Sequence, residues 1–197
     1  MKRLYDDETL IHTYSSLKKI VIKDDPLFEK LMKRIESETT YLTSPSSARY
    51  HGCFEKGLLE HSVSVAMEIL KLKKTMAPDL PDSVCVKVAL LHDLGKVGEI
   101  GNPFYLVNPD YNPNRSMTNY NAPYVYNDKI VEMPHAHRSV YLIQNMGYKL
   151  APEEFQAIIS HDGQYIDDNK QYRLKETKLT ILLHTADLWS ALFKEAE

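Results

Sequence analysis

Apolar residues recur every three or four positions through most of the chain, which is the spacing of amphipathic helices. Pro81 stands in the favoured first turn of one such stretch, and the glycines of LGKVG end it. Pro152 opens another, with two glutamates in its first turn. The pattern therefore predicts an all-α helical bundle. Its helices are expected at residues 26–38, from 57 onwards, from 81 to the LGKVG segment, and at 135–145, 152–161 and 176–195.

The helical spacing is lost between residues 98 and 134, where tyrosine, asparagine and proline accumulate. The segments FYLV and YVYN predict two short strands, so a small β-hairpin excursion is expected around residues 103–127. A connection this long in a small domain is usually functional or mobile. The 197 residues predict one domain, with a core over about 44–195 and an N-terminal helical extension over 1–40.

Composition narrows the class of protein. Hydrophobic residues make up 43% and charged residues 26%, a globular mixture that argues against disorder. The formal net charge of −3 gives no global basic field for nucleic acid, although a local basic cleft would not show in it. Cys53 and Cys85 have no metal-ligand spacing, and no apolar stretch suits a signal peptide or a membrane span. A cytoplasmic protein with reduced thiols is expected.

Histidines and aspartates occur on the apolar stripes of four predicted helices: His61, His92 with Asp93, His161 and Asp187. A single inward histidine is usually a core group bonded to a backbone carbonyl. Two inward aspartates are different, because burying each is costly and the two repel each other. A divalent cation resolves both problems. A His/Asp donor set without cysteine favours Mn, Fe, Co, Ni, Zn or Mg over a closed structural zinc site.

The segment LLHDLGK closely resembles the motif that names the HD-domain phosphohydrolase superfamily. The ordered set of His61, His92–Asp93 and Asp187 matches that family's pattern, and the match spans about residues 44–191. SPSSARYHGCFEKGLLEHSVSVA looks like the entry to the HD domain of bacterial 3′-to-5′ exoribonucleases and of related bacterial and phage HD hydrolases. The resemblance implies a single HD-domain helical bundle that holds a divalent metal at these four residues.

Two further segments resemble the third and fourth histidine helices of HD subgroups with two metals: PHAHRSVYLIQ and IISHDG. The resemblance implies that His135 and His161 bind a second ion, with Asp93 as the bridge. His137 is the alternative to His135, which is favoured because Ser139, four residues later, matches the small residue after the family's ligand. The Gly-Tyr-Pro stretch of cyclic-dinucleotide phosphodiesterases is missing after His161, which disfavours that substrate.

Catalytic and substrate-binding roles follow from the same resemblance. Asp93 is expected to be both ligand and water-orienting group. Lys96, one turn past His92, is placed to meet phosphate charge; the alternative is a plain cation at a helix C-terminus. Arg49 and His51 are candidates to clamp phosphate or to serve as an acid, against the alternative of a solvated loop arginine and a capping histidine.

Aromatic residues offer two interpretations. Tyrosines of the excursion either stack on a base as a lid or simply cover the hairpin: Tyr105, Tyr120, Tyr124 and Tyr126. His12 and His184 are expected to be structural, and Trp189 and Phe193 are expected to lie in the core.

The function implied by the resemblance is metal-dependent hydrolysis of a phosphoester, as a phosphomonoesterase or phosphodiesterase, through a metal-activated water. The expected partner is a nucleotide or a short single-stranded nucleic acid with a 3′ end. The 197 residues hold no second nucleic-acid-binding domain, so processive degradation of RNA is not expected. The alternatives are a phosphatase for a small non-nucleotide phosphate and a non-catalytic binding module, although the intact ligand set argues against the module.

Overall fold

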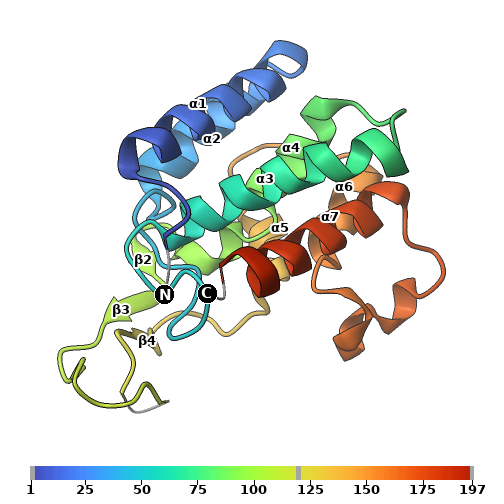
Figure 1. Cartoon of the computed structure of the whole chain (residues 1–197). Helices are drawn as coiled ribbons and strands as arrows, with labels where there is room; N and C mark the ends of the chain where they lie inside the picture. The colour runs from blue at the N-terminus through green and yellow to red at the C-terminus, as the bar shows by residue number, and fades with distance from the viewer. Residues whose placement is uncertain (1–2, 119–120, 196–197) are drawn as a thin grey trace.

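The computed structural model describes residues 3–118 and 121–195, so Tyr120 lies outside the described residues. Helices dominate this part of the chain and confirm the all-α class (Figure 1). The α-helices are α1 (Asp7–Asp24), α2 (Leu27–Glu38), α3 (Gly57–Met76), α4 (Asp82–Leu91), α5 (His135–Asn145), α6 (Pro152–Ile159) and α7 (Lys178–Trp189). Short 3-10 helices follow α4 and α6, namely η1 (Leu94–Val97), η2 (Gly163–Tyr165) and η3 (Asp167–Tyr172), and a π-helical turn, η4 (Ser190–Lys194), continues α7.

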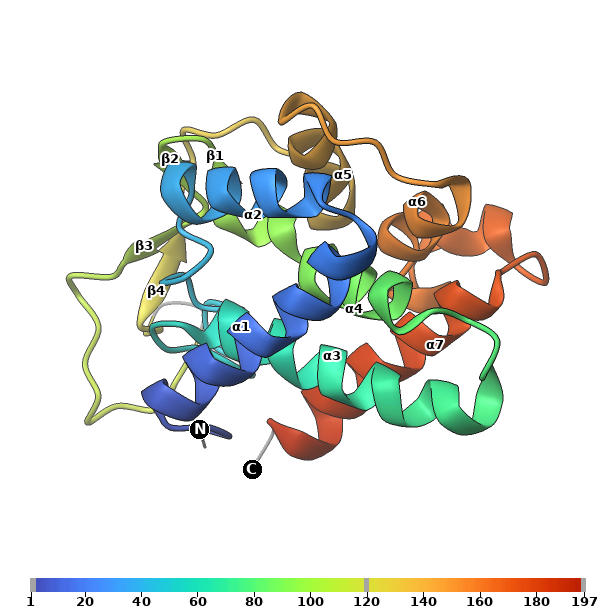
Figure 2. The same ribbon diagram turned by 90° about the horizontal axis from the view of Figure 1, so that it is seen from above.

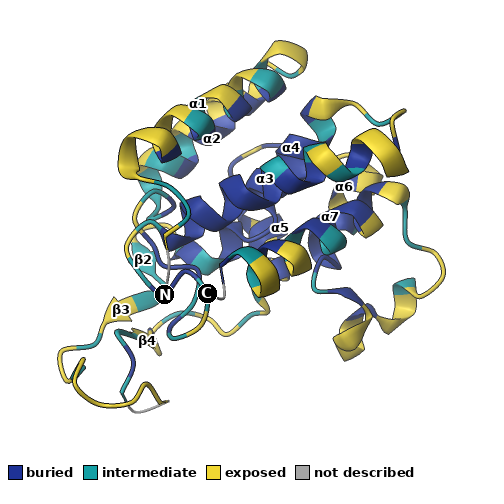
Figure 3. Cartoon of the chain, in the orientation of Figure 1, coloured by how far each residue is buried: buried dark blue, intermediate teal, exposed yellow. Residues whose placement is uncertain are grey.

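Helix α3 forms the centre of the bundle, and its first ten residues are all buried. It packs against α4 and α7, while α1 lies across α3 and α4 (Figure 2). Residues of α1 and α2, among them Leu17, Phe28 and Ile35, belong to the same core cluster as those of α3. The segment predicted as an N-terminal extension therefore packs into the common core, where the buried faces of these helices meet (Figure 3).

The predicted excursion contains the predicted hairpin. Strands β3 (Tyr105–Val107) and β4 (Tyr124–Tyr126) pair antiparallel, with Tyr105 opposite Tyr126. A second antiparallel pair, β1 (Gly98–Glu99) with β2 (Asn102–Pro103), was not expected from the sequence. Both sheets are short, and β3 and β4 project to one side of the helices (Figure 1).

The prediction that Trp189 and Phe193 lie in the core is wrong, because they are 51% and 61% exposed. The residue of this stretch that faces inward is Ser190, which is fully buried, receives a hydrogen bond from Ser64 and begins the π-helical turn. With Ser190 facing α3, the two rings point outward and pack on each other, 4.8 Å between centroids.

Two expectations from composition can be compared with the structure. Cys53 and Cys85 are free and buried, as predicted. Within residues 3–118 and 121–195, the helices lack the combination of length and apolar character needed to cross a membrane.

Candidate metal centre

The end of α4 brings His92 and Asp93 to the same interior. Neighbouring residues in a regular helix diverge by about 100°, so both could not face one point there. The α-helix ends at Leu91, and Asp93 adopts φ −98° and ψ 11° as the chain turns into η1. Both side chains are buried. A Cβ at Gly95 would lie 2.0 Å from the carbonyl oxygen of His135, so glycine is what lets α5 approach this turn.

Hydrogen bonds of Ser139 hold α5 against the turn that follows α4. Its hydroxyl donates to the carbonyl oxygen of His92 at 2.7 Å, and the backbone N–H of Gly95 donates to its Oγ at 2.7 Å. The residue is fully buried. This contact sets the start of α5 beside the end of α4, which positions His135, the first residue of α5.

The first group of side chains comes from α3, the end of α4 and α7. Nε2 of His61 lies 3.0 Å from Oδ1 of Asp187, 3.3 Å from Nε2 of His92 and 3.4 Å from Oδ2 of Asp93. Four ligands at ordinary bond lengths around one tetrahedral ion lie about 3.4 Å from one another. The spacing of these four donor atoms therefore suits a single transition-metal ion.

The second group comes from the start of α5 and the end of α6. Nε2 of His135 lies 3.2 Å from Nε2 of His161, 3.4 Å from Oδ1 of Asp93 and 3.4 Å from Oδ2 of Asp162. The two oxygens of Asp93 thus face different groups, Oδ2 the first and Oδ1 the second. His137, the alternative to His135, is exposed on α5 and does not face the centre.

Three of the imidazoles are oriented by acceptors on their far side. Nδ1 of His92 lies 2.8 Å from the carbonyl oxygen of Ala89, and Nδ1 of His161 lies 2.7 Å from that of Ile158. Nδ1 of His61 lies 3.0 Å from Oε1 of Glu195. An Nδ1–H that donates outward leaves Nε2 directed at the centre, which is the usual arrangement of metal-binding histidines.

Four carboxylates surround the centre: Asp93, Asp162, Asp187 and Glu195. Within the described part of the chain, Lys96 is the one lysine or arginine that forms an ion pair with any of them, with Nζ 2.6 Å from Oδ2 of Asp93. Burial opposes ionisation of Asp93, but Lys96 keeps its pKa well below the usual value. Oδ1 of Asp93 is buried without a hydrogen-bond partner among the described residues, which is costly unless a cation neutralises it.

Protons supply part of the missing positive charge. Burial alone would lower the pKa of His61, but Glu195 and Asp187 outweigh it and raise the pKa to about 10. The pKa of His161 rises to about 9 against the same effect of burial, because the carboxylates of Asp93 and Asp162 lie close to its Nε2. A divalent cation would replace these protons, because imidazole binds a metal in its deprotonated form.

The donor set of imidazole nitrogens and carboxylate oxygens, without thiolate, fits Mn, Fe, Co, Ni, Zn or Mg. No family model, no curated protein and no solved structure matches this chain. The geometry of the donor atoms is therefore the main support for a metal centre. The predicted ligands all reach it, namely His61, His92, Asp93, His135, His161 and Asp187.

The predicted substrate-binding residues lie at different distances from this centre. The ring of His51 is 5.2 Å from that of His61, and burial lowers the pKa of His51 to about 4, so it is neutral at pH 7. Arg49 instead lies over the ring of Tyr50, 4.7 Å from its centroid, and donates to the Tyr50 hydroxyl at 2.6 Å. The structure therefore places His51 at the centre, whereas Arg49 positions Tyr50.

Sequence reasoning missed two residues of the centre, and it did not connect a third residue, His184, with the cavities beside the centre. The sequence did contain a pattern that could have predicted Asp162 as a ligand, because His161–Asp162–Gly163 repeats the His-Asp pair of the earlier motif. No such pattern pointed to Glu195, because its direction depends on the π-helical turn that it follows. His184 was expected to be structural; its Nδ1 lies 2.8 Å from the carbonyl oxygen of His161, and its ring also lines two cavities.

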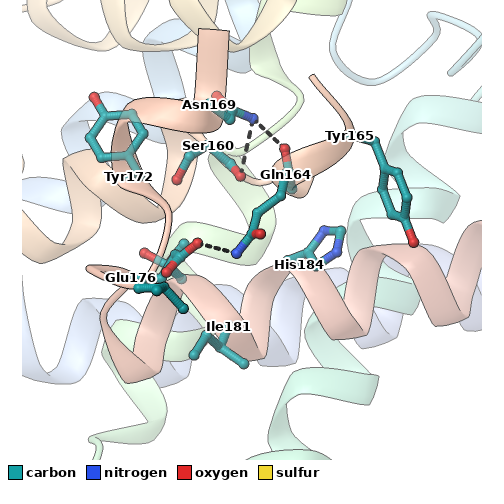
Figure 4. Close-up of a pocket in the computed structure, with 11 residues that line it drawn as sticks. Ser160, Gln164, Tyr165, Asn169, Tyr172, Glu176, Ile181 and His184 are labelled. Atoms are coloured by element: carbon teal, nitrogen blue, oxygen red, sulfur yellow. Dashed lines mark hydrogen bonds between the residues drawn. The ribbon is translucent and has the colours of Figure 1, made fainter. Parts of the chain in front are cut away.

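Three adjoining cavities give access to the centre. The smallest of the three, about 220 Å³, is lined by Asp93 and Asp187 and is called the mouth below. The excursion cavity, about 830 Å³, shares His51 and Lys96 with the mouth and extends beneath β3 and β4. The α6–α7 cavity, about 680 Å³, shares His184 with the mouth and lies between α7 and the η2–η3 segment (Figure 4).

Proposed function

We propose that this chain is a metal-dependent phosphohydrolase built on the HD-domain arrangement. The observation that supports this most is the position of Asp93, whose two oxygens each face a separate His/Asp group beside a cavity. The ligands follow one another along successive helices in the order of the HD pattern, and His92–Asp93 stand in the LLHDLGK motif.

Two sets of residues would hold the metal. The first ion would be bound by His61, His92, Asp93 and Asp187, and the second by His135, His161, Asp162 and Asp93. A bound divalent ion supplies Lewis-acid polarisation of a phosphoryl oxygen and lowers the pKa of a water.

The chain's own residues complete the site. Lys96 lines both the mouth and the excursion cavity, so its ammonium is available to a phosphate oxygen while it stays paired with Asp93. His51 lines the same two cavities as a neutral imidazole, which suits it to accept a hydrogen bond or a proton. Asp93 keeps the two groups of ligands at a fixed separation.

The substrate class proposed is a nucleotide or a short nucleic acid, because aromatic rings line the excursion cavity next to Lys96 and offer faces for a base. A small non-nucleotide phosphate is the second candidate. The observation in its favour is the mouth itself, whose volume of about 220 Å³ accommodates a phosphate without the larger cavities.

The test is a substrate screen on purified protein loaded in turn with Mn, Fe, Co, Ni, Zn and Mg. Candidates are nucleoside monophosphates, short RNA and DNA, p-nitrophenyl phosphate and bis-p-nitrophenyl phosphate. We expect metal-dependent hydrolysis of at least one phosphoester, lost in Asp93→Asn, which keeps the shape of the side chain. A folded protein that carries metal yet cleaves none of these substrates would contradict the proposal.

A further inference from the structure

The mouth of the metal centre has a large cavity on each side. His51 and Lys96 line both the mouth and the excursion cavity, and His184 lines both the mouth and the α6–α7 cavity. The excursion and the η2–η3 segment stand on opposite sides of the molecule (Figure 1). A phosphate at the mouth would therefore have a cavity beside it in each direction, one past His51 and Lys96 and one past His184.

The excursion cavity is walled by aromatic rings. Phe104 and Tyr126 lie 5.2 Å apart, Tyr105 and Tyr126 lie 5.7 Å apart, and the exposed ring of Tyr50 lines another part of the wall. Such rings bind a flat base by stacking. Arg138 in this lining is buried and donates to the carbonyl oxygen of Val131, whereas Asp128 and Glu132 are exposed, so a further phosphate would meet the two carboxylates.

The lining of the α6–α7 cavity is different, but it also disfavours a second phosphate. Among the described residues that form it there is no lysine or arginine, and Glu176 contributes a carboxylate that accepts from Gln164 at 2.6 Å. Tyr165, 88% exposed, and Ile181 supply ring and aliphatic surface (Figure 4). The cavity thus suits an uncharged organic group with a ring, and it repels a second phosphate.

We propose that the substrate is a phosphodiester with one uncharged, ring-bearing group on each side of a single phosphate, the class of the dinucleoside monophosphates. One nucleoside occupies the excursion cavity and the other the α6–α7 cavity, with Tyr165 as its stacking surface. This inference rests on the proposed hydrolase function and specifies its substrate.

The reaction is a hydrolysis without redox change. The oxygen of a water forms a bond to phosphorus, and the bond from phosphorus to one nucleoside oxygen breaks. That oxygen takes a proton that the water loses. The products are one nucleoside and one nucleoside monophosphate.

The first experiment changes the α6–α7 cavity alone. Tyr165→Ala removes the stacking surface, and Ile181→Trp fills the cavity from a half-exposed position of α7. Both should lower kcat/KM for a dinucleoside monophosphate by about tenfold, the scale of one lost base stack. Hydrolysis of methyl p-nitrophenyl phosphate, a diester with one ring, should stay within about twofold. Tyr141→Ala, at an exposed tyrosine of α5 outside these cavities, is the matched control.

The second experiment varies the charge of the substrate. Adding a terminal phosphate at either end of the dinucleotide, or lengthening it to a tetranucleotide, should lower kcat/KM at least tenfold, because the new charges face Asp128, Glu132 or Glu176. A rate that rises with chain length would overturn the proposal. So would variants Tyr165→Ala and Ile181→Trp that both cleave the dinucleotide at the wild-type rate.

A binding measurement separates this inference from the proposed function. The probe is a hydrolysis-resistant dinucleoside phosphorothioate, titrated into the metal-loaded protein by calorimetry. We expect about tenfold weaker binding in Tyr165→Ala and unchanged binding in Tyr141→Ala. Binding that depends on Tyr165 in a protein without any phosphoesterase activity would refute the function and keep the ligand class. Hydrolysis of monoesters with dinucleotide binding independent of Tyr165 would refute the ligand class and keep the function.

Discussion

Two clusters of buried charge involve residues of α4 or of the turn that follows it, and they are neutralised in different ways. Around Lys87, the ammonium lies 2.8 Å from Oδ2 of Asp25 and 3.0 Å from Oε1 of Glu154, and the Tyr148 hydroxyl donates to Asp25. One ammonium group and one hydroxyl group thus pair with two carboxylates. Burial opposes ionisation of Asp25, but the hydrogen bonds from Lys87 and Tyr148 still lower its pKa.

The candidate metal centre, by contrast, contains four carboxylates, and within the described residues the one lysine or arginine paired with any of them is Lys96, which contacts Asp93. Protons on His61 and His161 make up part of the difference, and one oxygen of Asp93 keeps no hydrogen-bond partner among the described residues. Burying charge is tolerated only when it is paired. The Lys87 cluster achieves this within the chain, whereas for the centre at Asp93 we propose that a divalent cation from solution completes the pairing.

The largest expected effect comes from removing the shared carboxylate. Asp93→Ala should lower phosphoester hydrolysis by at least about a thousandfold, since orientation, water activation and charge balance are all lost together. Rates are measured on protein shown to be folded by circular dichroism. A folded, metal-bearing Asp93→Ala protein with near-normal turnover would show that the centre is structural.

A substitution in the Lys87 cluster should lower the stability of the protein and leave its metal content unchanged. Lys87→Met leaves Asp25 and Glu154 without their cation and should lower the free energy of unfolding by roughly 3 kcal/mol. Lys33→Met, which removes an exposed pair with Glu29, is the matched control and should leave the free energy of unfolding almost unchanged. Urea unfolding measures both. Equal effects of the two changes would refute the distinction between buried and exposed pairs.

Removal of metal should destabilise the protein through the centre alone. At a metal concentration about a hundred times Kd, each bound ion contributes roughly 2.7 kcal/mol, which for a chain of this size raises Tm by about 5–10 °C per ion. Chelation should abolish the shift in wild type, and Lys87→Met should show the same shift from a lower starting Tm. Asp93→Ala should show little of it. Identical shifts in Asp93→Ala and wild type would place the bound metal elsewhere.

Lys96→Ala should have the smallest effect of these changes. Its ammonium contacts Asp93 and lines the mouth, yet it is not a ligand, so metal content should remain intact. The expected result is a tenfold or larger rise in KM for the phosphoester, of the order of one lost charge-assisted contact. Loss of metal in this variant would show instead that Lys96 acts by holding Asp93 in place.

Much of the fold was predictable because helix spacing and helix ends are local properties. The helix at 135–145 agrees with α5 to the residue, and the strands FYLV and YVYN pair as predicted. The inward positions of His61, His92 and Asp187 also followed from the apolar stripes on which they stand.

The rest depends on tertiary contacts that no local pattern contains. The π-helical turn that begins at Ser190 changes the direction of the side chains after it, Phe193 among them, and Ser190 itself is bonded to Ser64 of α3. Glu195 reaches Nδ1 of His61 across 134 residues of sequence. The choice between His135 and His137 was decided by the contact of Ser139 with the turn after α4, which fixes the face of α5.

The most direct test of the central claim is metal content per chain, measured by equilibrium dialysis with elemental analysis. We expect about two divalent ions in the wild type, about one in His135→Ala and in His161→Ala, and loss of the first ion in His61→Ala. His137→Ala, on the exposed face of the same helix as His135, should still bind about two. Folded wild-type protein that binds no divalent ion, or equal losses in His135→Ala and His137→Ala, would contradict the account.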